Sequence, residues 1–350
     1  MIHYRLATPD DNEQLMTLTS ATGMMGEASL RIERRPDFFR LLHMRGESKV
    51  FVALDGCLII GSLSVSTQKV YVGGEVYPLQ FIADFKVAEA YRNRSVEDHL
   101  CSQLADYVIS IDADLAFLNV SYGNEKPFSF FRHRDGFPDF DNIGFFNMHQ
   151  FIGRRNRMKP FFYTVECGSV SDELLTFLNA HSSGYELGPV ISEENMKDSE
   201  VFIIRHHGQM IAAMCLIDTI HAKQNFVIRL SRRWQWLIRA LNVWYSISGM
   251  SKMPSLHTPV RMLHVKYLAV KDNDFLLART LLDHARHIVY ERGYSFASLG
   301  MHERDPLHAC TAGMFKLTFR SVGMLVSLKN NRHIIGKVIN GVPFKDYALV

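Results

Sequence analysis

The residues whose types and spacing best suit ligand binding or catalysis lie at 82–100, with the sequence IADFKVAEAYRNRSVEDHL. The pattern predicts a strand, a short basic loop and the start of a helix. A helix N-terminus exposes unpaired backbone N–H groups and a partial positive charge, which suit phosphate. Arg92 and Arg94 add fixed cationic donors at the same place. The segment therefore predicts a site for a pyrophosphate such as that of coenzyme A.

This segment resembles the acyl-CoA signature of the GNAT (GCN5-related N-acetyltransferase) superfamily. Asp84 to Val87 match the family's strand, Tyr91, Arg92 and Arg94 match its loop, and Leu100 matches its helix. The family's loop glycines fall at Asn93, Ser95 and Glu97, of which Glu97 would place a carboxylate near phosphate. The resemblance implies the following contacts to acyl-CoA: Phe85, Lys86, Val87, Arg92, Asn93, Arg94, Ser95 and Val96.

A second match to the family follows at 124–137, NEKPFSFFRHRDGF. Asn124 matches a family asparagine, and Phe131 stands where the family often has the tyrosine that protonates the departing thiolate. Both are implied to contact acyl-CoA. Because Phe131 has no hydroxyl, the general acid would be Tyr122 or solvent.

The chemistry implied by the resemblance is direct transfer of an acyl group from a thioester to an amine. It needs a base that keeps the amine neutral and donors for the developing oxyanion. Backbone N–H groups near Phe85 and Val87 would polarise the thioester. Asp84 is the first candidate base, with a pKa raised by desolvation. Glu27 is the second, since its region borders the acceptor in the family.

The order of predicted elements occurs twice, which indicates an α/β (α+β) fold of two tandem GNAT-like domains. Each is expected to hold a mixed, mostly antiparallel central sheet flanked by helices. We place the domains at residues 1–158 and 159–350, with the basic run 153–159 at the boundary. In the second domain the loop Lys271–Asp274 is acidic and opposes phosphate, so this copy is expected to be degenerate.

Periodicity predicts long helices at 96–108 and 275–291, a helix at 30–44, and a final hairpin of strands at 323–328 and 334–338. All three tryptophans fall in 231–245, SRRWQWLIRALNVWY. This helix either grips a membrane, an acyl chain or a partner, or packs the two domains together. We favour the packing role and expect no membrane contact.

Composition limits the remaining possibilities. A net charge of +3 and a pI of about 8.5 do not indicate nucleic-acid binding. The sequence predicts no secretory signal and no membrane-spanning segment. Five dispersed cysteines predict reduced thiols, no zinc site and a cytoplasmic location. Paired histidines lack a third ligand, so no metal is expected.

These inferences together predict an N-acyltransferase. The donor would be an acyl-CoA, most simply acetyl-CoA, and the acceptor a small amine or amino acid in the cleft between the domains. Two alternatives stay open. One is a catalytically inactive GNAT-like binding protein, favoured by the lost glycines and by Phe131. The other is a long-chain N-acyltransferase, favoured by 24 phenylalanines and the tryptophan-rich helix. The sequence does not specify an oligomeric state.

Overall fold

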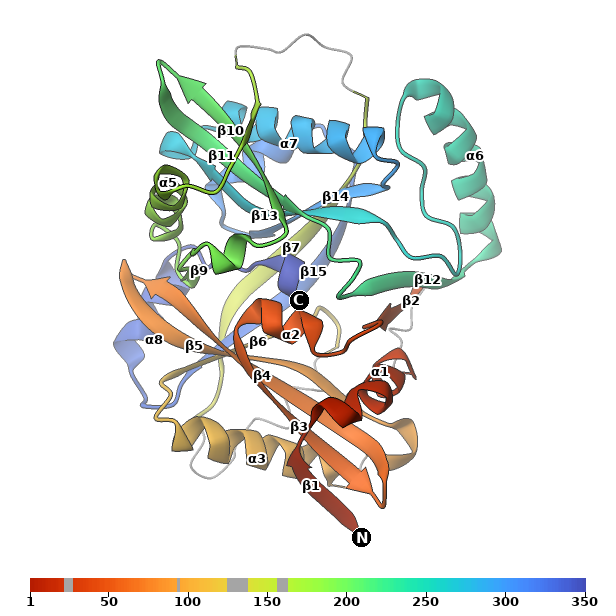
Figure 1. The fold of residues 1–350 in the computed structure, drawn as a ribbon, viewed down its shortest axis with the longest axis vertical. Helices are drawn as coiled ribbons and strands as arrows, with labels where there is room; N and C mark the ends of the chain where they lie inside the picture. Colours follow the sequence, from red (N-terminus) through yellow and green to blue (C-terminus); the bar gives the residue numbers. More distant parts are fainter. Residues whose placement is uncertain (22–27, 93–94, 125–137, 156–162) are drawn as a thin grey trace.

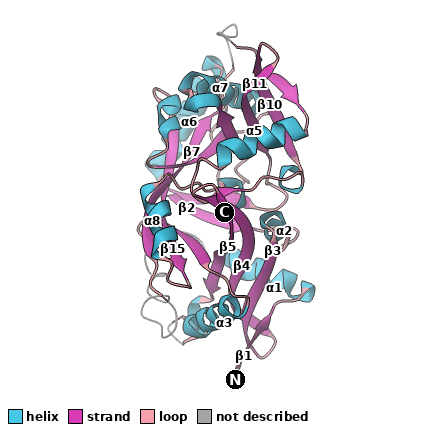
Figure 2. Ribbon diagram, turned by 90° about the vertical axis from the view of Figure 1, so that its left-hand side faces the viewer, coloured by secondary structure: helices cyan, strands magenta, loops and turns pink. Residues whose placement is uncertain are grey.

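The computed structural model describes residues 1–21, 28–92, 95–124, 138–155 and 163–350. Within these residues, thirteen strands form one mostly antiparallel sheet with helices packed against it, and two more form a separate ribbon (Figures 1 and 2). The expected fold class is confirmed.

The first part of the chain supplies the strands around the predicted acyl-CoA segment. Its elements are β1 (Ile2–Leu6), α1 (Asn12–Ala21), β2 (Ala28–Glu33), α2 (Arg40–Arg45), β3 (Glu47–Asp55), β4 (Leu58–Val72), β5 (Glu75–Val87), α3 (Val96–Ser110), β6 (Leu115–Ser121) and β7 (Asp141–Ile152).

The second part repeats this order and ends in a helix. Its elements are β8 (Glu166–Gly168), α5 (Asp172–Ser182), β9 (Gly188–Pro189), β10 (Ser199–His206), β11 (Gln209–Ile217), β12 (Gln224–Leu230), α6 (Arg232–Ser248), β13 (Met262–Val270), α7 (Phe275–Glu291), β14 (Phe296–His302), β15 (Lys316–Ser327) and α8 (Arg332–Asn340).

Helix α3 is held by the apolar face that the sequence predicts. Val96, Leu100, Leu104 and Val108 recur on one side of the helix and are fully buried against β4, β5 and β6. The close approach depends on Gly61 of β4, because a Cβ there would lie 3.0 Å from Leu100 and 3.2 Å from Val96. This packing fixes the N-terminus of α3 at the end of β5.

The two halves share the same central arrangement. In the first, β5 and β6 are parallel neighbours joined through α3, and in the second, β13 and β14 are parallel neighbours joined through α7. Each half then receives its next strand from the other. Strand β15 pairs with β6, β7 pairs with β14, and β7 and β15 pair with each other. The predicted division at 158/159 lies outside the described residues and stays a prediction, and one sheet contains strands from both parts of the chain.

Two local predictions are wrong. Residues 30–44 form the strand β2 and the short helix α2, because β2 pairs with β12, a strand far away in the sequence. Residues 334–338 lie in α8, where the Asn331 side chain accepts a hydrogen bond from the N–H of Ile334 over 3.3 Å and caps the helix. Helix α6 turns most of its large apolar side chains to solvent, but its Tyr245 packs against Ile152 of the first part and against Met262 and Phe296 of the second, which agrees with the packing role expected from the sequence.

Candidate active site

A β-bulge interrupts β5 at the predicted chemical segment. Ala83 lies opposite Ser64 and Lys86 opposite Ser62, so Asp84 and Phe85 together face one residue of β4. Asp84 adopts a φ of 53°, which is uncommon for a residue other than glycine. Bulges re-aim side chains next to active sites. Here the bulge directs the Asp84 carboxylate toward α2.

The Asp84 carboxylate is held by three donors. Arg34 Nη2 donates to Oδ1, Arg45 Nη1 donates to Oδ2 over 2.9 Å, and Ser64 Oγ donates to Oδ2 over 2.9 Å. Burial opposes ionisation, but the charges of Arg34 and Arg45 outweigh it and hold the pKa of Asp84 well below its ordinary value. The raised pKa expected from the sequence is wrong. Asp84 is a weak base and serves as the counter-ion of two buried arginines.

A lysine from the second half joins this group of charges. Gln224 of β12 pairs with Glu33 of β2, and Lys223 and Arg34 are the next residues beyond this pair, close enough for their charges to interact. Like charges at such short range repel each other. Burial, and then the positive charges of Arg34 and Arg45, lower the pKa of Lys223 to about 7. Its Nζ donates to the carbonyl oxygen of Val350.

We call Arg34, Arg45, Lys86, Lys223 and Asp84 the central charge cluster. Burial also lowers the pKa of Lys86, against the opposing charge of Asp84. The Arg34 residue is 3% exposed, and its Nε and Nη1 atoms have no hydrogen-bond partner in the part of the chain that the structure describes. Four cationic side chains therefore surround one carboxylate, and one of them has unused donors.

Three members of this cluster escaped sequence reasoning. Arg34 and Arg45 lie in a segment that looks like an ordinary polar helix, and Lys223 lies far away in the sequence. The only local signal is the run Arg34-Arg35 before Pro36, which marks a break in the chain but does not indicate burial. The cluster becomes visible only when β2 and β12 are paired.

The predicted phosphate loop follows directly on β5. Arg92 is exposed and its Nε donates to the carbonyl oxygen of Val87 over 3.4 Å, while Asn93 and Arg94 lie outside the described residues. Ser95 stands at the start of α3 with a φ of 57°, and Val96 is buried below it. Arg92 and the N-terminus of α3 are thus next to each other, as the sequence predicts.

Glu97 occupies a position in the first turn of α3 where the family has glycine. The residue is 6% exposed, and its charge contributes, after burial, to a raised pKa of Tyr4 on β1. The negative charge of Glu97 is therefore close enough to β1 to affect Tyr4. This placement reduces the repulsion of phosphate that the sequence suggests, because β1 packs on the sheet edge away from β6.

Strands β5 and β6 diverge next to the bulge. Their pairing runs from Leu79 with Leu115 to Ile82 with Leu118, although both strands continue beyond these pairs. The backbone of Ala83–Val87 and that of Asn119–Ser121 therefore form no ladder with each other. Such a divergence leaves two strand edges facing each other, which an extended ligand can bridge.

Tyr122 and Asn124 lie beyond the end of β6, at the same sheet edge as the bulge. Tyr122 is 63% exposed and its ring meets that of Phe145, with centroids 5.7 Å apart. Asn124 is exposed, and its backbone N–H donates to Ser121. Glu27 and Phe131 lie outside the described residues. The described candidates thus gather at one edge, although no contact joins Tyr122 to Asp84.

The corresponding loop in the second half is occupied by its own side chain. The Asp274 carboxylate accepts hydrogen bonds from the N–H groups of Leu276 at 2.7 Å and Leu277 at 3.3 Å, and so caps α7. The amides that would bind phosphate are already used, and the cap adds a negative charge. This geometry supports the expectation of a degenerate second copy.

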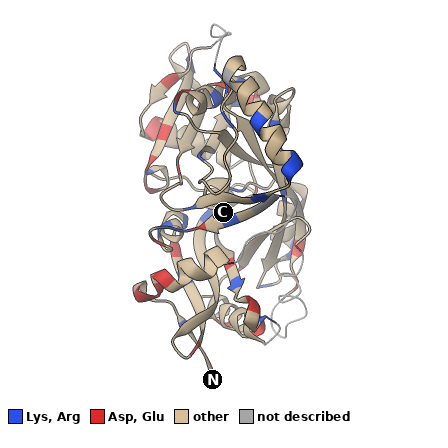
Figure 3. Ribbon diagram, turned by 90° about the vertical axis from the view of Figure 1, so that its right-hand side faces the viewer, with Lys and Arg blue, Asp and Glu red and all other residues tan. Residues whose placement is uncertain are grey.

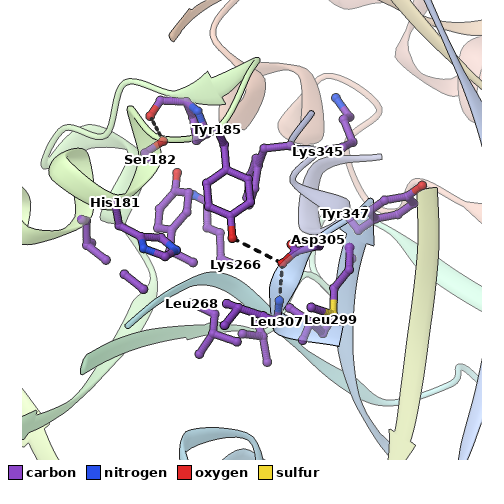
Figure 4. A pocket seen from close by; sticks show the side chains of 18 of the residues that line it. His181, Ser182, Tyr185, Lys266, Leu268, Leu299, Asp305, Leu307, Lys345 and Tyr347 are labelled. Carbon is purple, nitrogen blue, oxygen red and sulfur yellow. Dashed lines mark hydrogen bonds between the residues drawn. The ribbon is translucent and has the colours of Figure 1, made fainter. Parts of the chain in front are cut away.

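The second half instead carries a pocket beside its parallel strands, with an empty volume of about 580 Å³ including its open mouth (Figure 4). Tyr185 donates to Asp305 over 3.3 Å on its wall, and burial raises the pKa of the Asp305 carboxyl. Lys345 reaches from this pocket to the first half, with Nζ 3.3 Å from the centroid of the Phe81 ring. The Arg45 guanidinium lies 5.2 Å from the same ring. Phe81 therefore separates the pocket from the central charge cluster.

Solved structures of other proteins share this architecture across nearly the whole chain. N-myristoyltransferase from Saccharomyces cerevisiae with bound myristoyl-CoA matches 93% of this chain and 78% of its own, with a TM-score of 0.63 and 9% identity. A GCN5-related N-acetyltransferase from Anabaena variabilis matches 93% and 72%, with a TM-score of 0.54 and 10% identity. One from Kribbella flavida matches 93% and 70%, with a TM-score of 0.52 and 11% identity.

The chain has the GNAT fold. Since the arrangement of parallel strands around a helix occurs in both halves, it is a tandem GNAT fold, as the resemblance at 82–100 implied. No protein-family model and no curated protein matches the sequence itself. In this GNAT fold the loop predicted to bind phosphate, the bulge and the strand divergence all lie in the first half.

Two further features of the described residues bear on the chemistry. They contain no group of three or more His, Cys, Asp or Glu side chains arranged to hold a metal ion. Among the same residues, no helix combines the length and the hydropathy needed to cross a membrane.

Proposed function

We propose that the protein is an N-acyltransferase that transfers an acyl group from acyl-CoA to a small amine or amino acid. The observation that carries the proposal is the bulge at Asp84, which sets the central charge cluster beside the strand divergence of a GNAT fold. Structural neighbours with this fold carry the names of N-acetyltransferase and N-myristoyltransferase.

Acyl-CoA is placed in the first half. Its pyrophosphate would lie at the N-terminus of α3 beside Arg92. Its extended arm would run between Ala83–Val87 and Asn119–Ser121, where the two strands no longer pair. This path brings the thioester to Phe85 and Lys86, next to the cluster. The second half is excluded for this role because Asp274 caps α7.

Acylation requires the acceptor amine in its uncharged form. The positive charges of the central charge cluster favour that form. Lys223 is itself an alkylamine in this environment, and its pKa falls to about 7. An acceptor amine beside Arg34 and Arg45 would meet the same positive potential and the same loss of water. Its pKa would therefore be lowered, which favours the uncharged amine. This replaces the role first assigned to Asp84.

The reaction follows from that state. The amine nitrogen attacks the thioester carbonyl carbon, and the C–N bond forms as the carbonyl oxygen takes the negative charge. The carbon–sulfur bond then breaks, the amide carbonyl re-forms, and the CoA thiolate accepts a proton. The nitrogen, which is positively charged after the attack, loses one proton to solvent and becomes the amide nitrogen. Tyr122 and Glu27 remain predicted participants in these proton transfers, and backbone N–H groups at 85–87 the predicted oxyanion donors.

Of the two acceptor classes, the cluster favours an amino acid. Arg34 has two donors without a partner among the described residues, and a carboxylate is the group that guanidinium donors bind best.

The acyl chain is proposed to be acetyl, with a long chain as the second candidate. The long chain is favoured by one observation: the N-myristoyltransferase neighbour has the higher TM-score, 0.63 against 0.54. The protein is proposed to act in the cytoplasm, in keeping with its five free cysteines.

The first test is calorimetric titration with CoA, acetyl-CoA and myristoyl-CoA. Micromolar binding is expected, and the preferred chain length selects between the two candidates. Transfer is then measured with alanine and with ethylamine, which differ by a carboxylate. Alanine is expected to be the better acceptor, and Arg34→Gln is expected to reduce this preference. Binding of CoA without transfer would identify an inactive GNAT-like binding protein, and absence of binding would overturn the proposal.

A further inference from the structure

Helix α6 presents an unusual number of large apolar side chains to solvent. Their exposed fractions are 47% for Trp234, 70% for Trp236, 45% for Leu237, 67% for Val243, 54% for Trp244 and 76% for Ile247. We call the last five of these residues the α6 apolar face. The opposite side of the helix is anchored, since Tyr245 is 3% exposed and packs with Ile152, Met262 and Phe296. The helix is therefore held on the protein with its apolar face outward. Figure 1 shows α6 at the side of the molecule.

The surroundings of this face are basic. From residue 219 to residue 271 the sequence contains no Asp or Glu. Figure 3 turns this side of the molecule to the viewer, and Lys and Arg segments occur on α6 without acidic ones. The exposed Lys and Arg residues of this region are Arg229, Arg232, Arg233, Arg239, Lys252, Arg261 and Lys271.

Two of these arginines lie where they destabilise the helix. Arg232 and Arg233 occupy the first turn of α6, which has no acidic residue. The helix macrodipole places positive charge at this end, so cations there are unfavourable. Ser231 caps the helix through its hydroxyl, and neither arginine forms an ion pair with a residue that the structure describes. An external anion is the partner that would offset this repulsion.

A lipid surface fits these observations better than a protein surface does. Tryptophan, leucine and arginine on one peripheral helix are the combination found where helices lie at a membrane interface. A second copy of the chain is disfavoured, because a symmetric dimer through α6 would bring two basic surfaces together.

We propose that α6 docks the protein onto an anionic lipid surface. The helix would lie parallel to the membrane plane, with Trp236, Val243 and Ile247 among the headgroups and Arg232, Arg233 and Arg239 at lipid phosphates. This surface is separate from the proposed acyl-CoA site, and its role does not depend on catalysis. It contradicts the expectation from sequence that the protein avoids membranes.

The test uses intrinsic fluorescence, because all three tryptophans of the chain lie in α6. Full-length protein is mixed with vesicles of phosphatidylcholine alone or of phosphatidylcholine with phosphatidylglycerol, without acyl-CoA. We expect a blue shift of the emission and co-sedimentation with the mixed vesicles only. Added salt weakens the binding by screening the arginines.

Two variants separate the apolar and charged contributions and keep every tryptophan. Val243→Asn with Ile247→Asn is expected to lower vesicle affinity by about tenfold or more. Arg232→Gln with Arg233→Gln is expected to lower it by about tenfold and to remove the preference for anionic lipid. Leu58→Asn is the matched control, since Leu58 is 57% exposed in the first half. It is expected to bind like the unmodified protein.

Other results would overturn the proposal. Unchanged emission with anionic vesicles would exclude lipid docking. A blue shift that grows with protein concentration and needs no vesicles would indicate self-association. An equal shift with poly-glutamate would indicate an acidic protein partner, and loss of binding in the Leu58 control would make the effect non-specific.

Discussion

Arg45 Nη1 lies 2.9 Å from Asp84 Oδ2 and so joins helix α2 to the bulge of β5. The same arginine donates through Nε to the carbonyl oxygen of Leu349 over 2.6 Å. One side chain therefore connects the predicted reaction strand to the segment that passes between the halves. Arg45 is buried. Among the carboxylate side chains of the described residues, Asp84 is the one that forms an ion pair with it.

We expect Asp84→Asn to lower the free energy of unfolding by about 3–5 kcal/mol, because it leaves Arg34 and Arg45 buried without a counter-charge. Urea unfolding measures this change. The pKa of Asp84 is lowered in the folded state, so its contribution is complete above the unfolded pKa of about 4 and is lost as the pH falls below it. Glu173→Gln, in the exposed pair with Arg205, is the control and should have little effect. Full stability with loss of transfer would restore Asp84 as a base.

Lys223→Met should change how stability depends on pH. The pKa of Lys223 is about 7 in the folded protein against 10.5 ordinarily, so between these values the unfolded chain binds more protons. Stability of the unmodified protein therefore rises from pH 7 to pH 10, and this rise should be smaller in the variant by roughly 2 kcal/mol. Lys329→Met, at an exposed lysine, should keep the full rise. An unchanged pH profile in Lys223→Met would mean that the lysine titrates normally.

Arg92→Ala should weaken CoA binding by about 1–3 kcal/mol, the size of a charge-assisted contact. Calorimetry measures it directly. The matched variant is Asp274→Ala at the start of α7, which should lower stability by about 1 kcal/mol through loss of the helix cap and leave CoA affinity unchanged. If Arg92→Ala and Asp274→Ala lowered CoA affinity equally, the prediction that CoA binds at the Arg92 loop would be wrong.

Gly300→Ala should lower stability by about 1–3 kcal/mol through overpacking. A Cβ at Gly300 would lie 2.1 Å from the Tyr347 ring, whose hydroxyl interacts with Ser321. Gly336→Ala is the control, because a Cβ there meets nothing within 4 Å and alanine favours the helix. It should raise the midpoint of thermal unfolding. A stable Gly300→Ala protein would show that Tyr347 can move aside.

Sequence reasoning succeeded where the information was local. The helix at 275–291 has the bounds predicted from its periodicity, and Val96, Leu100 and Leu104 form the predicted buried face of α3. The loop at Arg92 and the acidic cap at Asp274 were also readable, because a strand, a loop and a helix start are adjacent in the chain.

It failed where distant segments decide the outcome. Residues 30–33 form a strand only because β12 pairs with them, and Lys223 reaches Arg34 only through that ribbon. The raised pKa expected for Asp84 assumed burial alone, whereas two arginines from other elements reverse its direction. Periodicity contains no record of such partners, so the chemistry of the cluster could not be derived before the fold.

Because the halves exchange strands, β6 is synthesised long before the strand that pairs with it. Leu115 of β6 pairs with Ser327 of β15, so β6 emerges from the ribosome about 200 residues before its neighbour exists. At about 5–20 residues per second, this edge waits roughly 10–40 seconds for its partner. During that time the first half carries an open strand edge that could pair with other nascent chains. The yield of folded protein would then depend on whether chaperones bind this open edge until β15 is synthesised, more than on the stability of the finished sheet.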